Sequence, residues 1–194
     1  MRSEKQRLGR KRDSRVDHAI VTATRELLVE HGYARLTVDA VAARAGIGKA
    51  AIYRRYASRQ EMVFASVVHD EDIVAPPDSG SLRGDLSALL DEIVAQLANP
   101  AAAAAVPALL SDVTADPGLA ARFRQRFIAR QQECLAELLD RAVARGELPT
   151  RPTIDIVHAQ LLGPVFAWHF LLRNEPSGDF TIGHVDGLVA SLTE

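Results

Sequence analysis

The stretch that decides the fold is residues 37–56, TVDAVAARAGIGKAAIYRRY. Apolar residues recur at helical spacing on both sides of Gly46, which predicts two short helices joined by a glycine turn. Thr37 is expected to cap the first helix, and Gly46 can adopt the positive φ that such a turn requires. This layout is typical of a helix-turn-helix, whose second helix can enter the major groove of DNA.

The second helix of the motif is expected to run from Lys49 to Tyr56 and to have one polar face. Residues at i, i+1, i+4 and i+5 share a helix face, and here they are Lys49, Ala50, Tyr53 and Arg54. Lysine and arginine can reach phosphates or guanine edges, tyrosine can donate to a phosphate, and alanine permits close approach to thymine methyl groups. The alternative is a basic amphipathic helix that packs on its neighbour without contacting DNA.

Helical periodicity continues on both sides of the motif. A first helix is predicted over residues 14–31, opened by a Ser14-x-x-Asp17 capping box, and a fourth begins at a Ser58-x-x-Glu61 capping box. Turn-forming residues at 75–82, APPDSGSL, then indicate a loop between domains. Beyond this loop we expect helices at about 82–98, 101–114, 116–145, 153–173 and 179–192. Pro164 should kink the fourth of them or leave one of its carbonyls free. The sequence thus predicts an all-α chain.

The net charge of −2 conceals an uneven distribution. Residues 1–60 contain 14 Lys and Arg against 6 Asp and Glu, whereas residues 61–194 contain 9 against 19. Residues 1–13 are basic, polar and without apolar periodicity, so they are expected to form a flexible arm. A basic head on an acidic body suggests a polyanionic partner for the head, although a solvated charged surface gives the same pattern.

Composition narrows the class of protein. With 47% hydrophobic and 25% charged residues, the chain is expected to fold around a packed core. No apolar run approaches the ~20 residues of a membrane span and no secretory signal is recognisable, so we expect a cytoplasmic protein with no membrane partner. The single cysteine, Cys134, agrees with a reducing compartment and is interpreted as a core residue.

Nothing in the sequence favours catalysis or a resident metal. His158, His169 and His184 lack the close spacing of metal ligands and have no cysteine cluster beside them. No Ser/His/Asp grouping, phosphate-binding loop or dinucleotide fingerprint occurs. We therefore expect no metal, no cofactor and no catalytic residue. Two alternatives to a sequence-specific DNA-binding protein stay open. One is a helical enzyme or small-molecule-binding protein with an incidental basic N-terminal domain, and the other is a nucleoid-type DNA binder without a ligand.

A longer pattern surrounds the helix-turn-helix, in residues 20–67, IVTATRELLVEHGYARLTVDAVAARAGIGKAAIYRRYASRQEMVFASV. It combines an apolar first helix ending in Gly-Tyr, a Leu-Thr pair, a helix of small residues and a Gly-Ile-x-Lys-x-x-Ile-Tyr segment. Over residues 15–68 this pattern resembles the TetR family of transcription regulators. The resemblance implies a helix-turn-helix DNA-binding domain at 14–74, with its motif at 37–56, and a helical effector-binding and dimerisation domain at 82–194.

The resemblance also implies a fold, a function and partners. The fold would be all-α, with an N-terminal three-helix helix-turn-helix domain and a C-terminal helical domain for ligand binding and dimerisation. The chain would be a ligand-released repressor that binds a palindromic operator as a homodimer. Its partners would be double-stranded operator DNA, a small-molecule effector of unknown identity, and a second copy of the chain joined through the last two long helices.

Carried over by position, the resemblance implies a set of DNA-binding residues. Thr37 would cap its helix and contact a phosphate, and Arg55 and Arg59 would bind the DNA backbone. Gly48 would be the N-cap of the second helix, at a position where serine or threonine is common. The residues facing the groove would be Lys49, Ala50, Ala51, Tyr53 and Arg54.

The effector-binding residues are not identified by the sequence. The candidates for an apolar pocket with a few polar groups are Trp168, Phe123, Phe127, Leu110, Gln125 and His158. Each of these residue types is more often a plain core residue, so no ligand-binding residue is assigned.

Overall fold

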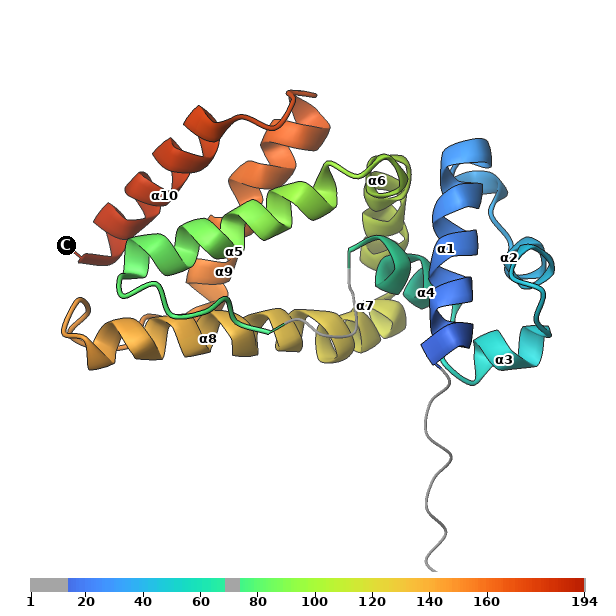
Figure 1. Ribbon diagram of the computed structural model, residues 1–194, viewed down its shortest axis with the longest axis horizontal. Coiled ribbons are helices and arrows are strands. Elements are labelled where there is room, and N and C mark those ends of the chain that lie inside the picture. Colours follow the sequence, from blue (N-terminus) through green and yellow to red (C-terminus); the bar gives the residue numbers. More distant parts are fainter. Residues whose placement is uncertain (1–13, 69–73, 194) are drawn as a thin grey trace, which may run out of the picture.

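The computed structural model describes residues 14–68 and 74–193, and within these ranges the regular structure is helical and contains no strand (Figure 1). The all-α fold class predicted from the sequence is therefore confirmed. The expected basic arm, residues 1–13, lies outside the described residues.

The N-terminal domain is built from α1 (Ser14–His31), α2 (Val38–Arg44), α3 (Lys49–Tyr53) and α4 (Arg59–Val67), with a 3-10 turn at Tyr33–Arg35. Thr37 caps α2, as predicted, because its hydroxyl accepts a hydrogen bond of 3.1 Å from the amide of Ala40. Gly46 has the positive φ, 66°, that the turn between α2 and α3 requires.

Two details of this domain differ from the predictions. The helix expected to reach Tyr56 ends at Tyr53, because the Arg55 amide bonds the Ile52 carbonyl, three residues back, and so tightens the last turn. Asp17, expected to complete a capping box with Ser14, forms an ion pair with Arg55. The carboxylate of Asp17, in the first turn of α1, thereby binds the segment that follows α3.

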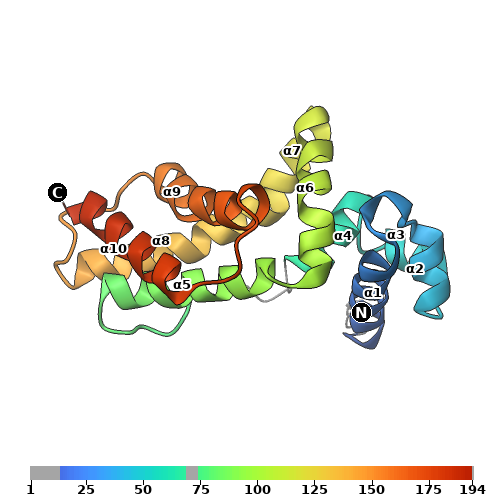
Figure 2. The same ribbon diagram turned by 90° about the horizontal axis from the view of Figure 1, so that it is seen from above.

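The body consists of α5 (Leu82–Leu97), α6 (Pro100–Ala115), α7 (Pro117–Phe123), α8 (Ala129–Ala144), α9 (Ile154–Phe166) and α10 (Gly178–Thr193). Helix α5 packs against α8 and α10, and α8 also packs against α9. Helix α6 stands across the end of the body and contacts α1 and α4, so it forms the junction between the two parts of the molecule (Figures 1 and 2).

The helices predicted at 116–145 and 153–173 are each interrupted by one π turn. The first π turn, Arg124–Ile128, separates α7 from α8, and the second, Ala167–Leu171, follows α9. The second comes just after Pro164, which has no amide hydrogen to donate within the helix. Inserted π turns of this kind are frequent at functional sites, and the first one lies beside the N-terminal domain.

A buried carboxylate fixes the beginning of α5 to the end of α8. Asp85 is fully buried and accepts hydrogen bonds from the hydroxyl and amide of Ser79, at 2.7 and 2.8 Å. The guanidinium of Arg145 lies 3.0 Å from Asp85 and also pairs with Asp78 and Glu147. Burial opposes ionisation of Asp85, but the hydrogen bonds from Ser79 and Arg145 lower its pKa, so the carboxylate stays charged.

Replacing Arg145 should therefore destabilise the body. Arg145→Met leaves the buried Asp85 carboxylate with only its Ser79 partners, and we expect a loss of about 3–5 kcal/mol in the free energy of unfolding. The matched control is Arg151→Met, which removes an exposed pair with Asp140 and should cost no more than about 1 kcal/mol. Urea unfolding followed by circular dichroism at one protein concentration measures both changes. Equal losses would contradict this account of Asp85.

Candidate nucleic-acid interface and internal cavity

Helices α2 and α3 lie on the side of α1 that faces away from the body (Figure 1). In and around α3, a set of the sequence-predicted residues is exposed together: Thr37, Gly48, Lys49, Ala50, Tyr53 and Arg54. Ala51 is half-buried, while Ile52 and Tyr56 are buried in the core of the domain. The buried pair anchors a short helix whose opposite face presents basic, hydroxyl and small side chains to solvent.

Lys49 is paired within the protein but remains accessible. Its ammonium lies 2.5 Å from Asp39 on α2, and both side chains are more than half exposed. A surface pair of this kind contributes little to stability, at most about 1 kcal/mol. A phosphate could therefore replace Asp39 at small cost.

Arg55 and Arg59 are engaged within the protein, which argues against the phosphate contacts predicted for them. Arg55 is mostly buried, pairs with Asp17, and donates 3.1 Å to the carbonyl of Ala51. Arg59 donates to the carbonyls of Tyr33 and Leu36 at 2.9 and 3.2 Å and lies over the Tyr33 ring at 4.3 Å. Their guanidinium groups therefore hold α3 and the turn before α2 in place through contacts inside the protein.

A buried carboxylate links the N-terminal domain to the body. Glu61 on α4 is only 3% exposed, and Arg126 of the first π turn lies 2.9 Å from it, with Arg122 at 3.4 Å. Glu61 also accepts 3.1 Å from the amide of Ala57. Arg126 donates a second bond of 3.0 Å to the carbonyl of Arg55, just beyond α3. One side chain of the body thus contacts both α4 and the segment directly after α3.

A second polar contact crosses the same junction at Asp112, on α6. Its carboxylate accepts from the Tyr33 hydroxyl at 2.6 Å and from the Gln60 amide at 3.0 Å, and the Arg59 guanidinium lies 3.5 Å away. Hydrogen bonds from Tyr33 and Gln60 hold the pKa of Asp112 below its usual range, and burial together with the Asp112 contact raises the pKa of Tyr33. At neutral pH the contact therefore joins a charged Asp112 to a protonated Tyr33.

Aromatic packing completes the junction. Phe64 on α4 meets Phe123 and Phe127 of the body, with ring centroids 4.3 and 4.5 Å apart. Phe123 and Phe127 were candidates for an apolar pocket, and they are instead part of the core between the two domains. Trp168, another candidate, stacks on Phe180 at 4.5 Å.

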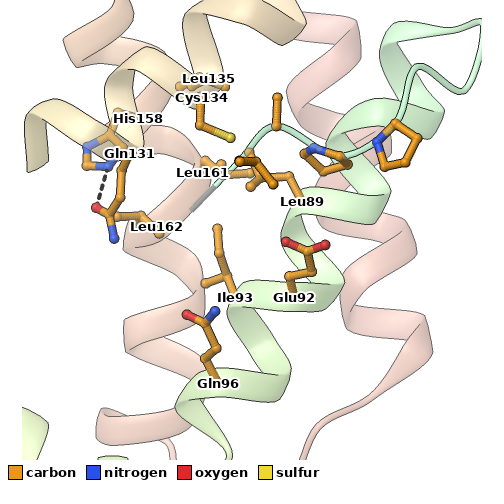
Figure 3. Close-up of a pocket in the computed structure, with 14 residues that line it drawn as sticks. Leu89, Glu92, Ile93, Gln96, Gln131, Cys134, Leu135, His158, Leu161 and Leu162 are labelled. Carbon is orange, nitrogen blue, oxygen red and sulfur yellow. Dashed lines mark hydrogen bonds between the residues drawn. The ribbon is translucent and has the colours of Figure 1, made fainter. Parts of the chain in front are cut away.

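The body contains a cavity of about 230 Å³ between α5, α8, α9 and the segment 74–77 (Figure 3). Its walls are mainly aliphatic and include Leu89, Ile93, Leu135, Leu161 and Leu162. The polar groups in the lining are Glu92, Gln96, Gln131, Cys134 and His158. Of the six pocket candidates considered from the sequence, His158 is the one that lines this cavity.

The sequence did not identify Arg126, Asp112 or Glu92 as functional candidates. Charged residues at helical spacing ordinarily form the solvent-exposed face of a helix. No local pattern distinguishes these three residues from their neighbours. A group of His, Cys, Asp or Glu able to hold a metal is not found within residues 14–68 and 74–193.

Comparison with known proteins identifies both parts of the chain. Residues 20–65 match the model described as bacterial regulatory proteins, tetR family, and residues 76–188 match the model described as tetracyclin repressor-like, C-terminal domain. An uncharacterised HTH-type transcriptional regulator of Mycobacterium tuberculosis is 32% identical over 171 residues, covering 88% of this chain and 84% of the relative. The DNA-binding transcriptional repressor TetR of Mycobacteroides abscessus is 27% identical, covering 86% of this chain and 87% of the relative.

Solved structures agree on the fold. A TetR transcriptional regulator from Agrobacterium tumefaciens superposes with a TM-score of 0.63 at 18% identity and covers 93% of each chain. The two matched domain models span the exposed α3 face as well as the body that holds the cavity. The chain therefore belongs to the TetR family of DNA-binding transcriptional regulators.

Proposed function

We propose that this chain is a ligand-released repressor whose homodimer binds a palindromic operator. The DNA-binding domain would comprise residues 14–74 and the effector-binding and dimerisation domain residues 82–194. The observation that carries the proposal is the exposed face of α3, which is anchored on a buried core and presents Lys49, Tyr53 and Arg54 together. We propose that the chain acts by binding and not by catalysis, as expected of a regulator in this family.

We propose a division of labour among the predicted DNA-binding residues. Lys49 and Tyr53 would bind phosphates, and Arg54 would reach base edges. Ala50 and Ala51 would allow the helix to approach the groove closely. Thr37 and Gly48 would contact the DNA backbone at the N-termini of α2 and α3. Arg55 and Arg59 would act indirectly, because their internal bonds hold α3 in place.

Arg54→Ala should weaken binding to the operator more than binding to unrelated DNA. If Arg54 bonds a guanine edge, its loss should cost about 1–3 kcal/mol of base discrimination. The matched control is Arg151→Ala, which removes the same charge from an exposed site on the body, where Arg151 pairs with Asp140 on α8, and should change neither affinity. Electrophoretic shift on the DNA upstream of the protein's own gene and on random DNA, at fixed salt, measures both variants. Equal losses on the two DNAs for Arg54→Ala would contradict the base-reading role.

The same assay separates the alternative functions. A helical enzyme or carrier with an incidental basic domain would bind neither DNA, and a nucleoid-type protein would bind both alike. Preference of the unaltered protein for one DNA over the other is the outcome that the operator-binding proposal requires.

Apolar surface on α9, α10 and the turn between them supports the proposed dimer. Ile156, Leu171, Leu172 and Ile182 are each more than half exposed in the single chain. The stretch Ile154–Leu171 is long and apolar enough to cross a membrane, and only 17% of it is buried within the single chain. An exposed apolar surface of this kind is typical of an interaction site, and we propose that a second copy of the chain covers it.

A charge on this surface should separate the dimer. Ile182→Glu would bring a carboxylate into the proposed interface, where it has no cationic partner to offset its desolvation. Val29→Glu, on α1, is the matched control, because Val29 is 59% exposed and Ile182 is 52% exposed. Sedimentation equilibrium should show a monomer for Ile182→Glu and a dimer for Val29→Glu. A dimer in both variants would show that α10 lies outside the interface.

The junction contacts give the proposed release a physical route. Ligand in the body would favour an arrangement in which the two α3 helices no longer fit consecutive grooves. Helix α4 leads from the DNA-binding domain toward the body, and α6 and the first π turn pack against it. Because Arg126 bonds both Glu61 and the carbonyl of Arg55, a shift of the π turn would move the end of α3 as well as α4.

Arg126→Met should therefore reduce the coupling between effector and operator. Any compound that weakens operator binding by some factor must bind the operator-loaded protein more weakly by the same factor, and typical coupling is about 1–3 kcal/mol. We expect a smaller factor in Arg126→Met than in Arg130→Met, whose exposed pair with Glu133 lies on α8, just after the π turn. Fluorescence titration with and without operator DNA measures the factor. Arg126→Lys, which retains a charge beside Glu61, replaces the methionine variant if that variant does not fold.

A further inference from the structure

The charges around the cavity are unbalanced. Its lining contains one carboxylate, Glu92, and no lysine or arginine among the described residues. The arginines whose charges reach the cavity-lining Cys134 are Arg130 and Arg141. Each of them is paired on α8, with Glu133 at 2.9 Å and with Glu137 at 2.5 Å respectively. An anionic group in the cavity would therefore meet the Glu92 carboxylate and no lysine or arginine among the lining residues that the structure describes.

Glu92 is exposed, and within residues 14–68 and 74–193 it forms no ion pair. In Figure 3 its side chain rises from α5 beside Leu89 and Ile93, on the opposite side of the cavity from His158 and Gln131. A carboxylate that is still hydrated can attract a cation without the large desolvation cost of a buried ion pair. The aliphatic walls beside it can cover the apolar remainder of the same ligand.

The far side of the cavity is polar but uncharged. His158 and Gln131 are joined by a hydrogen bond of 3.1 Å, and burial lowers the pKa of His158. The imidazole is therefore neutral at physiological pH, although the charge of Asp155 on the same helix raises its pKa. Neither group supplies the positive charge that a carboxylate or phosphate ligand needs.

We infer that the effector is a compact apolar molecule with one cationic nitrogen, whose nitrogen lies beside Glu92 and whose apolar part fills the space between Leu89, Ile93 and Leu161. This inference rests on the proposed function, because it assigns a chemical class to the effector of that same cavity. At about 230 Å³ the cavity lies below the ~300–1,000 Å³ of most small-molecule sites, so the ligand is small.

The test compares three molecules of one shape and different charge: 4-phenylbutylamine, 4-phenylbutanol and 4-phenylbutyrate. Calorimetry on the full chain should give the amine an affinity about three- to tenfold higher than that of the alcohol, as expected for one partly hydrated charge pair. The carboxylate should bind more weakly than both. An order in which the carboxylate binds best would overturn the inference.

Cys134 reports where these molecules bind. It is the only cysteine of the chain, it lines the cavity, and burial raises its pKa to about 11, so alkylation by iodoacetamide is slow. Occupation of the cavity by the amine should slow it further, as measured by intact mass. A second hollow, of about 350 Å³ and lined by Arg173, does not include Cys134. Heat of binding without protection of Cys134 would place the ligand elsewhere and refute the inference.

Glu92→Gln isolates the charge. It should abolish the preference for the amine over the alcohol while leaving the affinity for the alcohol unchanged. Asp91→Asn, an exposed carboxylate beside it on α5 that does not line the cavity, is the matched control and should keep the preference. A preference retained in Glu92→Gln, or no binding by any of the three molecules, would overturn the inference.

Release of operator DNA is measured separately. If the amine binds in the expected order and protects Cys134 but leaves operator binding unchanged, the ligand class stands and the ligand-release part of the proposed function fails. If the amine fails to bind while the operator is still recognised specifically, the ligand class fails and DNA recognition stands.

Discussion

The burial of the Glu61 carboxylate is the constraint on which the arrangement of the two domains depends. A buried carboxylate is costly unless it is paired and hydrogen-bonded. Glu61 lies on α4, and the cations that neutralise it, Arg126 and Arg122, come from the body. Neither domain can therefore satisfy this group alone. The orientation of α4 relative to the π turn between α7 and α8 follows from this requirement.

Several side chains extend the same constraint to the helix-turn-helix. Arg126 also bonds the carbonyl of Arg55, and the Arg55 side chain in turn is paired with Asp17 on α1. Arg59 binds the turn that precedes α2 through the carbonyls of Tyr33 and Leu36. The exposed face of α3 takes no part in these internal contacts, because Arg55, Arg59 and Arg126 make them. A short helix can present its side chains in fixed positions only if its other face is anchored in this way.

The body distributes its apolar surface between three uses. Much of it forms the continuous core that also includes the Phe64, Phe123 and Phe127 cluster. A smaller part lines the cavity around Leu161, and another part stays exposed on α9 and α10. Residues of α9 contribute to the cavity wall and to the exposed surface at once, through Leu161 and Ile156. A ligand in the cavity and a second chain on the surface would therefore act on the same helix.

The sequence by itself determined the helical fold, the position of the helix-turn-helix and the exposed face of α3, because these depend on residues a few positions apart. Thr37 caps the helix that follows it, and Gly46 supplies the turn, whatever the rest of the chain does. It could not predict the π turns, since each covers only five residues, which is too short a stretch for an apolar pattern to reveal a change in backbone hydrogen bonding. The roles of Arg55 and Arg126 were decided only by the tertiary structure. Their partners, Asp17 and Glu61, are 38 and 65 residues away, and an arginine has the same local signature whether it faces solvent, a phosphate or a buried carboxylate.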